Sequence, residues 1–279
     1  MEFKYFQFDE KQILEFLIKD GLITIDDIVY LSGSVVESTV NLKYSGMGNE
    51  ESDLDIFIIR KDDNFDIDDN GGYKRRHKIT VFKKYFDIQC DIEIYRFSDV
   101  CELLNNLNKI QFSEQVRTPN LLPRPVGWNQ RDVKSFINRL NYSIVIQNEQ
   151  QYQLLQNKCN LAAYSKYSMQ LIINEIDSLI ADIWGNLKPE TYDVALYLTR
   201  NAFIKLLEFM LYSDYQTVDR TKWIIFKGLI CVSDNEEYLG LYNELFKGEV
   251  SNFKTCKKII IKSVDLINEY IQDMDIMEL

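Results

Sequence analysis

The sequence predicts an α+β fold, with a mixed sheet and flanking helices in the first part of the chain and an all-helical bundle in the second. Apolar runs of strand length, several with strict alternation, lie before about residue 97. From residue 129 onward, apolar residues recur at helical spacing without strand-like alternation. Three of the four prolines cluster in residues 119–125, where they stiffen a connection. We therefore predict two domains, residues 1–122 and residues 126–279.

The composition is that of a globular protein without a membrane-spanning segment. The chain has 279 residues, of which 46% are hydrophobic and 27% are charged. Its five cysteines lack zinc-site spacing and its start lacks a signal-peptide pattern, so we expect a cytoplasmic protein with free thiols. The formal net charge of −11 argues against extended nucleic-acid binding, but it leaves room for a local basic groove. The oligomeric state does not follow from the sequence.

The first elements are predicted from apolar spacing and turn residues. They are a helix at residues 9–22, a short buried strand at 28–31, a helix from 34 to 40 and a polar loop at 41–52. Gly33 and Ser34 form the turn after the strand. Glycine lets a backbone approach a phosphate closely, and serine adds a hydroxyl donor at the start of a helix. Gly33 and Ser34 are therefore candidate phosphate contacts.

The next strand begins with two carboxylates, in the sequence Asp53-Leu54-Asp55-Ile56. Because side chains alternate across a strand, Asp53 and Asp55 project from one face, whereas Leu54 and Ile56 point into a core. Two carboxylates a few ångströms apart repel each other strongly in a partly buried site. A divalent cation relieves this repulsion, and Mg²⁺ prefers such oxygen ligands alongside substrate phosphates.

A polar hairpin tip is predicted for residues 61–78. It contains the opening spacing of a calcium loop, starting at Asp66, but His77 stands where a bidentate glutamate is needed. We therefore predict no calcium site there.

Two strands follow at residues 78–85 and 86–97, and then a helix to about residue 107. The second strand has one apolar face and one acidic face, and the acidic face includes Asp91 and Glu93. An acidic strand face needs cations or water, so it is the natural place for a third metal ligand.

These pieces, in this order, resemble the DNA polymerase beta-like nucleotidyltransferase superfamily. The pattern of that family is an apolar strand, Gly-Ser, a loop, Asp-x-Asp inside an apolar strand, and a third carboxylate on a later strand. Here the pieces are Gly33 with Ser34, Asp53 with Asp55, and the strand that carries Asp91. The resemblance covers about the first hundred residues. The predicted two-domain layout is similar to that of aminoglycoside-type nucleotidyltransferases.

The resemblance implies a transferase that uses a nucleoside triphosphate, with ATP as the expected substrate and two Mg²⁺ ions as the expected cofactors. It assigns Asp53, Asp55 and a third carboxylate to the metal. Asp91 and Glu93 both fit the third position by spacing. A short carboxylate suits the tight octahedral shell of Mg²⁺, so we assign Asp91 to the metal. The longer Glu93 is assigned to acceptor contact or general base.

In the second part, helices are predicted at about 190–212, 218–231 and 236–247, with another apolar stripe near the C-terminus. In similar two-domain adenylyltransferases, a helix of this domain offers a cation and a hydroxyl to the triphosphate. The candidates here are Thr221 and Lys222, with Arg200 and Lys205 on another helix. Exposed helix charges without a ligand are the alternative interpretation.

Three functional hypotheses remain open at this point. The first is transfer of a nucleoside monophosphate, AMP, to a hydroxyl of a small molecule, with release of pyrophosphate. The second is modification of a macromolecule, by protein AMPylation or addition to transfer RNA, or synthesis of a cyclic nucleotide. The third is a non-catalytic nucleotide sensor. The acidic surface would suit a cationic small acceptor, which ranks the first hypothesis highest.

Overall fold

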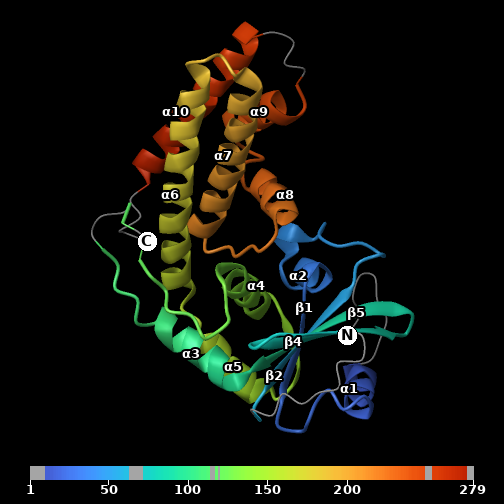
Figure 1. Ribbon diagram of the computed structural model, residues 1–279. Helices are drawn as coiled ribbons and strands as arrows, with labels where there is room; N and C mark the ends of the chain where they lie inside the picture. The colour runs from blue at the N-terminus through green and yellow to red at the C-terminus, as the bar shows by residue number, and fades with distance from the viewer. Residues whose placement is uncertain (1–9, 63–71, 114–116, 119, 249–252, 275–279) are drawn as a thin grey trace. The chain divides into compact units, whose positions relative to one another are not determined.

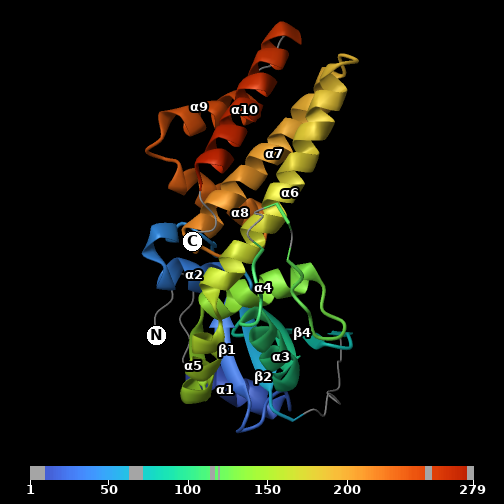
Figure 2. The same cartoon turned by 90° about the vertical axis from the view of Figure 1, so that its left-hand side faces the viewer.

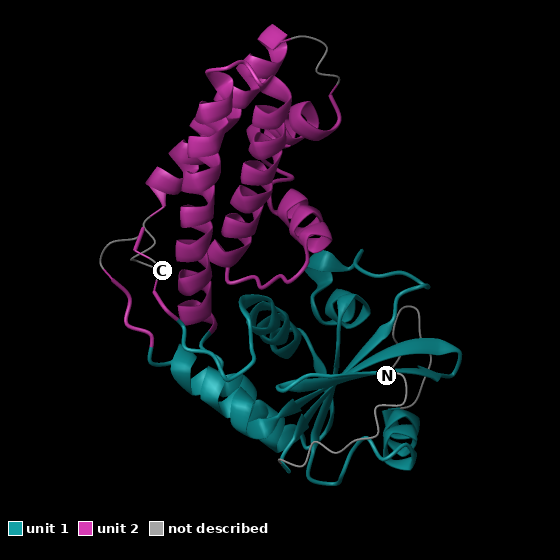
Figure 3. Ribbon diagram, in the orientation of Figure 1, with its two compact units in different colours: residues 1–109, 122–160 teal, residues 110–121, 161–279 magenta. Residues whose placement is uncertain are grey.

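The computed structural model describes residues 10–62, 72–113, 117–118, 120–248 and 253–274 (Figure 1). The hairpin tip around Asp66 lies outside these residues. The chain divides into two compact units (Figure 3). Unit 1 comprises residues 1–109 and 122–160, and unit 2 comprises residues 110–121 and 161–279.

Unit 1 is built on a six-stranded mixed sheet with the strand order β3-β4-β5-β2-β1-β6. The strands are β1 (Ile28–Ser32), β2 (Leu54–Arg60), β3 (Tyr73–Lys74), β4 (Lys78–Tyr85), β5 (Ile88–Arg96) and β6 (Ile144–Gln147). The central strands β2 and β5 are parallel, and the other neighbouring strands of this sheet are antiparallel. The predicted mixed sheet with flanking helices is therefore confirmed.

The helices of unit 1 pack around this sheet. They are α1 (Glu10–Lys19), α2 (Ser34–Val40), the 3-10 helix Leu42–Tyr44, α3 (Phe97–Leu107), α4 (Gln130–Asn141) and α5 (Glu149–Lys158). The start of α4 is fixed by a capping box, in which the Asn129 side chain accepts from the backbone of Asp132 and the Asp132 side chain accepts from the backbone of Asn129.

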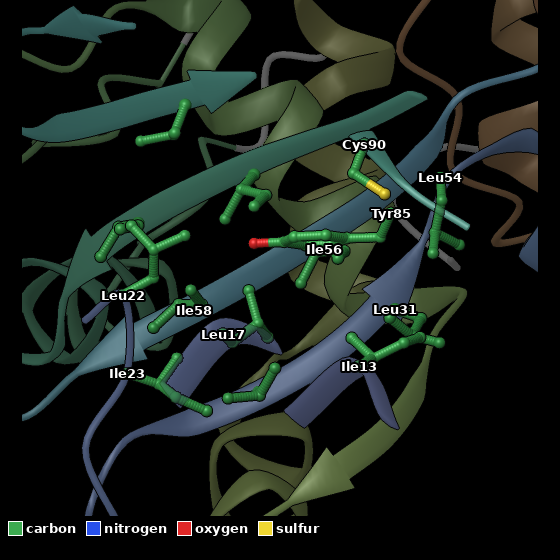
Figure 4. Close-up of a cluster of buried hydrophobic side chains, with 14 of the residues drawn as sticks. Ile13, Leu17, Leu22, Ile23, Leu31, Leu54, Ile56, Ile58, Tyr85 and Cys90 are labelled. Atoms are coloured by element: carbon green, nitrogen blue, oxygen red, sulfur yellow. The ribbon is translucent and has the colours of Figure 1, made fainter. Parts of the chain in front are cut away.

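The sheet has two faces of different chemistry. One face, the apolar face, carries Ile56 and Ile92, which pack with Ile13 and Leu17 of α1 and Val35 of α2 in a continuous core (Figure 4). On the opposite face, the carboxylate face, Asp55 and Asp91 lie beside buried aromatic rings. The rings of Tyr30, Phe57 and Tyr95 lie in successive stacked pairs across neighbouring strands, and α4 and α5 contact them through Phe136 and Tyr152.

The structure corrects the predicted boundary at residues 122–126. Residues 122–160 belong to unit 1, and residues 110–121 belong to unit 2. The reason is that the chain returns to the sheet after the prolines. β6 pairs antiparallel with β1, and Trp128 packs against Tyr95 of β5. The prediction that everything after residue 126 is helical is thus wrong at β6.

Unit 2 is helical in its described residues. Its helices are α6 (Leu161–Leu187), α7 (Tyr192–Ser213), α8 (Thr221–Cys231), α9 (Glu236–Phe246) and α10 (Phe253–Asp273). The long helices α6 and α7 lie side by side (Figures 1 and 2), and α7 also packs against α8 and α10. No helix among the described residues has both the length and the apolar character needed to span a bilayer. The predicted helical bundle is confirmed.

Candidate active site

Strand pairing brings the predicted carboxylates to one place on the sheet. Asp55 of β2 lies directly beside Asp91 of the parallel strand β5, and on its other side it lies beside Ser32 of β1. Asp53 directly precedes β2, so strand alternation places it on the same face as Asp55. Asp55 and Asp91 are half-buried, whereas Asp53 is exposed. Asp55, near the start of β2, and Asp91, in the middle of β5, thus lie side by side, and Asp53 comes just before β2.

Gly33 holds the backbone of the β1–α2 turn against the Asp55 carboxylate. Its φ of 92° lies in the region that favours glycine. A Cβ built on Gly33 would lie 1.8 Å from Asp55 Oδ2 and 2.7 Å from Asp55 Cγ. No side chain fits in that space, so the close approach of backbone and carboxylate requires glycine. Ser34 follows as the half-buried first residue of α2.

The negative charges of the three carboxylates affect the pKa of the buried Cys90 thiol. Cys90 points into the apolar core from β5, next to Asp91 in the chain. Its pKa is raised to about 11, first by burial and then by the negative charges of Asp91, Asp53 and Asp55. All three carboxylates therefore lie close enough to one point to act on the same group. This concentration of negative charge is the electrostatic property that a cation would relieve.

Glu93 has partners of its own within the carboxylate face. Lys78 Nζ lies 2.7 Å from Glu93 Oε1, and the Tyr95 hydroxyl donates to Glu93 Oε2 at 2.5 Å. Tyr95 is fully buried, and burial followed by the charge of Glu93 raises its pKa well above the ordinary value. Each oxygen of Glu93 is therefore held by a donor from the protein.

The sequence did not reveal Lys78 and Tyr95 as neighbours of the site. Lys78 pairs with Tyr95 in the β4–β5 register, and Glu93 lies two residues before Tyr95 on the same face. The sequence shows a lysine at the start of one hairpin strand. The register of the hairpin decides which residues of the next strand this lysine faces, and the sequence does not show that register.

The donor chemistry fits Mg²⁺, although no complete ligand cage is present. Within the described residues, no group of three Asp, Glu, His or Cys side chains is arranged to hold a metal ion. Mg²⁺ is commonly bound through one or two carboxylates together with water and substrate phosphates. The neighbouring Asp55 and Asp91, with Asp53 just before the same strand as Asp55, supply that type of donor.

The remaining predicted contacts lie in unit 2. Thr221 and Lys222 are exposed at the start of α8, where the Lys222 ammonium lies 4.6 Å from the Trp223 ring centroid. Arg200 of α7 donates through Nε to the carbonyl of Leu245 at 2.7 Å. Lys205 pairs with Glu175 and Glu208. Arg200 and Lys205 are thus held by partners within unit 2, whereas Thr221 and Lys222 are presented to solvent.

Comparison with known proteins gives a likeness of fold. No protein-family model and no curated protein matches the sequence. The structure is similar to the crystal structure of a nucleotidyltransferase-like protein from Exiguobacterium sibiricum, with a TM-score of 0.50 and 10% sequence identity. The similarity covers 93% of this chain and 74% of that chain. At this identity, the likeness shows a shared fold.

Proposed function

We propose that this protein is a Mg²⁺-dependent nucleotidyltransferase that moves AMP from ATP to a hydroxyl of a small molecule and releases pyrophosphate. The observation that carries the proposal is the close approach of the Gly33 backbone to the Asp55 carboxylate, with Asp91 on the neighbouring strand. A glycine backbone is suited to approach a phosphate closely, and neighbouring carboxylates are suited to hold a cation. The shared fold with a nucleotidyltransferase-like protein supports the same reaction class.

In this proposal, each residue of the site has a distinct task. Asp53, Asp55 and Asp91 hold Mg²⁺, and the turn at Gly33 and Ser34 contacts the triphosphate. Mg²⁺, when bound, neutralises charge on the phosphoryl oxygens and on the leaving pyrophosphate. The protein orients the acceptor hydroxyl for in-line attack on the α-phosphorus, which supplies a large share of the rate.

The tasks of the other residues follow from their contacts. Glu93, fixed by Lys78 and Tyr95, contacts or deprotonates the acceptor hydroxyl. Thr221, Lys222 and Arg200 of unit 2 stay predicted contacts of the triphosphate. Of these, Lys222 presents its charge on the surface of α8, whereas Arg200 would have to exchange its bond to Leu245.

The test is incubation with Mg²⁺ and ATP labelled at either the α- or the γ-phosphate, with a panel of cationic small acceptors. Transfer of the α-label to a small product, with the γ-label released in pyrophosphate, is expected. The double variant Asp55→Asn/Asp91→Asn should abolish transfer. Asp87→Asn serves as the control, because Asp87 is exposed at the β4–β5 turn and, among the described residues, its carboxylate pairs with the exposed Lys84 alone.

Different outcomes separate the hypotheses. If the α-label appeared on the protein itself or on RNA, the acceptor would be a macromolecule and not a small molecule. Binding of ATP without turnover under any of these conditions would contradict nucleotidyl transfer and favour a sensor.

A further inference from the structure

The groove between α9 and α10 of unit 2 concentrates positive charge in an acidic protein. Lys254, Lys257 and Lys258 lie in the first two turns of α10 and are exposed. A cavity of about 830 Å³ is lined by Lys254 and Lys258 together with Ile259 and, from α9, Glu244. A second cavity, of about 520 Å³, shares Lys254 and Lys258 and adds Lys257. The chain as a whole carries a net charge of −11, so this clustering is a local exception.

Lys254, Lys257 and Lys258 form no ion pair with a described residue, whereas Lys262, one turn further on, lies 3.4 Å from Glu244. These lysines do not stabilise helix α10 through its dipole either. The N-terminal end of a helix carries a partial positive charge, so cations in its first turns are unfavourable there. Structural reasons therefore do not explain the cluster.

The chemistry of the groove favours phosphate over a protein partner. Lysine is depleted in protein–protein interfaces, whereas it is a common point-charge contact for phosphates. The spacing of Lys254 and Lys258 by one helical turn, about 6 Å, presents successive charges along one line. Asp265 and Glu269, further along α10, and Glu237 of α9 line the smaller cavity together with the lysines, so the basic part of the groove is its end at the first turns of α10.

An exposed aromatic residue precedes these lysines at the start of α10, one helical turn before Lys257 and outside the lining of the two cavities. Phe253, the first residue of α10, is 71% exposed, and its ring lies 5.5 Å from that of Tyr192. Surfaces that bind single-stranded nucleic acids combine a basic groove along the backbone with aromatic rings on which bases stack. We propose that this surface, formed by Phe253, Lys254, Lys257 and Lys258, binds a short stretch of single-stranded nucleic acid. The lysines contact the phosphates, and Phe253 stacks with a base.

The test is fluorescence anisotropy with a labelled single-stranded oligoadenylate RNA, measured over a range of salt concentrations. The triple variant Lys254→Gln/Lys257→Gln/Lys258→Gln should weaken binding about tenfold or more, and it should reduce the slope of log K against log salt by about 2, since each phosphate contact contributes roughly 0.7. Glutamine keeps the helix propensity, so the variant should fold, which its thermal melting checks. The matched control is Lys109→Gln/Lys158→Gln/Lys188→Gln, which removes the same charge from exposed positions outside the groove.

A second variant addresses the aromatic part. Phe253→Ala should weaken binding at least about fivefold and leave the salt slope unchanged, because it removes stacking and no charge. Any one of three results would overturn the proposal. The first is an equal loss of RNA affinity in the two triple variants, and the second is no effect of Phe253→Ala on RNA affinity. The third is competition by polyglutamate that is as tight as competition by RNA. An absence of RNA binding by the unaltered protein would also overturn it. Binding requires neither Mg²⁺ nor turnover, so it should persist in Asp55→Asn and stand or fall separately from the proposed nucleotidyl transfer.

Discussion

The apolar face and the carboxylate face of the unit 1 sheet are formed by alternate residues of the same strands, yet they have different tasks. On the apolar face, Ile56 and Ile92 are fully buried among other hydrophobic side chains. On the carboxylate face, their chain neighbours Asp55, near the start of β2, and Asp91, in the middle of β5, remain partly accessible. The comparison teaches that stability and chemistry are separated by one position along a strand. Substitutions at adjacent residues should therefore have opposite consequences.

The largest effect is expected at Asp55. Asp55→Asn should reduce transfer by at least about a thousandfold, because it removes a charge that holds the metal opposite the phosphates. Folding should be unchanged or slightly more stable without metal, because a repulsion between carboxylates is relieved. Steady-state turnover and thermal melting without metal measure the two quantities. A large loss of stability would mean that Asp55 belongs to the structural face, and the distinction would fail.

The neighbouring residue should show the reverse behaviour. Ile56→Ala should lower the free energy of unfolding by about 2–5 kcal/mol, because it leaves a cavity in a fully buried core. At a temperature where the variant is folded, its turnover per folded molecule should stay within about twofold of the original protein, since no atom at the site is lost. Urea unfolding gives the first quantity. A loss of turnover as large as that of Asp55→Asn would contradict the separation of the faces.

A smaller effect is expected at Glu93, which tests the difference within the carboxylate face. Glu93→Gln should lower the rate by roughly a hundredfold, the low end for a lost general base, and leave Mg²⁺-dependent ATP binding unchanged. Asp91→Asn should remove activity at every pH. Isothermal calorimetry with ATP and Mg²⁺ separates the two roles. If Glu93→Gln abolished this binding while Asp91→Asn stayed active, the roles of Asp91 and Glu93 would be exchanged.

Gly33 offers a comparison between two glycines. In Gly33→Ala, the backbone would keep a positive φ and the new Cβ would overlap with the Asp55 carboxylate. The substitution should therefore lower the free energy of unfolding by about 1–3 kcal/mol and also displace Asp55. Gly21 has a φ of 69° but open space where a Cβ would stand. Gly21→Ala should therefore be destabilised only through its backbone and should keep turnover. Chemical denaturation and activity assays of both variants provide the test, and equal loss of turnover would remove the special role of Gly33.

The smallest expected effect concerns His77, which packs beside the carboxylate face against Trp128. Burial lowers the pKa of His77, in spite of the opposing charge of Asp132, whose Oδ2 lies 3.4 Å from His77 Nε2. As pH falls below about 6.5, the unfolded chain therefore takes up the proton before the folded chain does. Stability present at neutral pH should be lost as pH falls through the lowered pKa. Between about pH 7 and pH 5, the urea concentration at the midpoint of unfolding should fall less in His77→Gln than in the original protein. Equal pH dependence of the two midpoints would contradict this assignment.

The elements that the sequence predicted well are those with strong local patterns. The predicted helices at about 190–212, 218–231 and 236–247 correspond closely to α7, α8 and α9. The approach of Gly33 to Asp55 follows from the pairing of β1 with β2, the next strand along the chain. In contrast, β6 has only four half-buried residues and a partner strand distant in the chain, so no local pattern marked it. The partners of Glu93 also depended on register, which alternation alone does not determine.

The β6 strand has a practical consequence for dissecting the protein. β1 lies next to the edge of the sheet, and β6 covers its outer row of backbone hydrogen-bonding groups. Ser32 Oγ, at the end of β1, also donates at 2.6 Å to the carbonyl of Tyr142, 110 residues away. A fragment that stops at residue 122 would leave β1 as an open, apolar edge, and such edges pair with other chains. An isolated unit 1 should therefore continue to residue 160 if it is to remain in solution without aggregating.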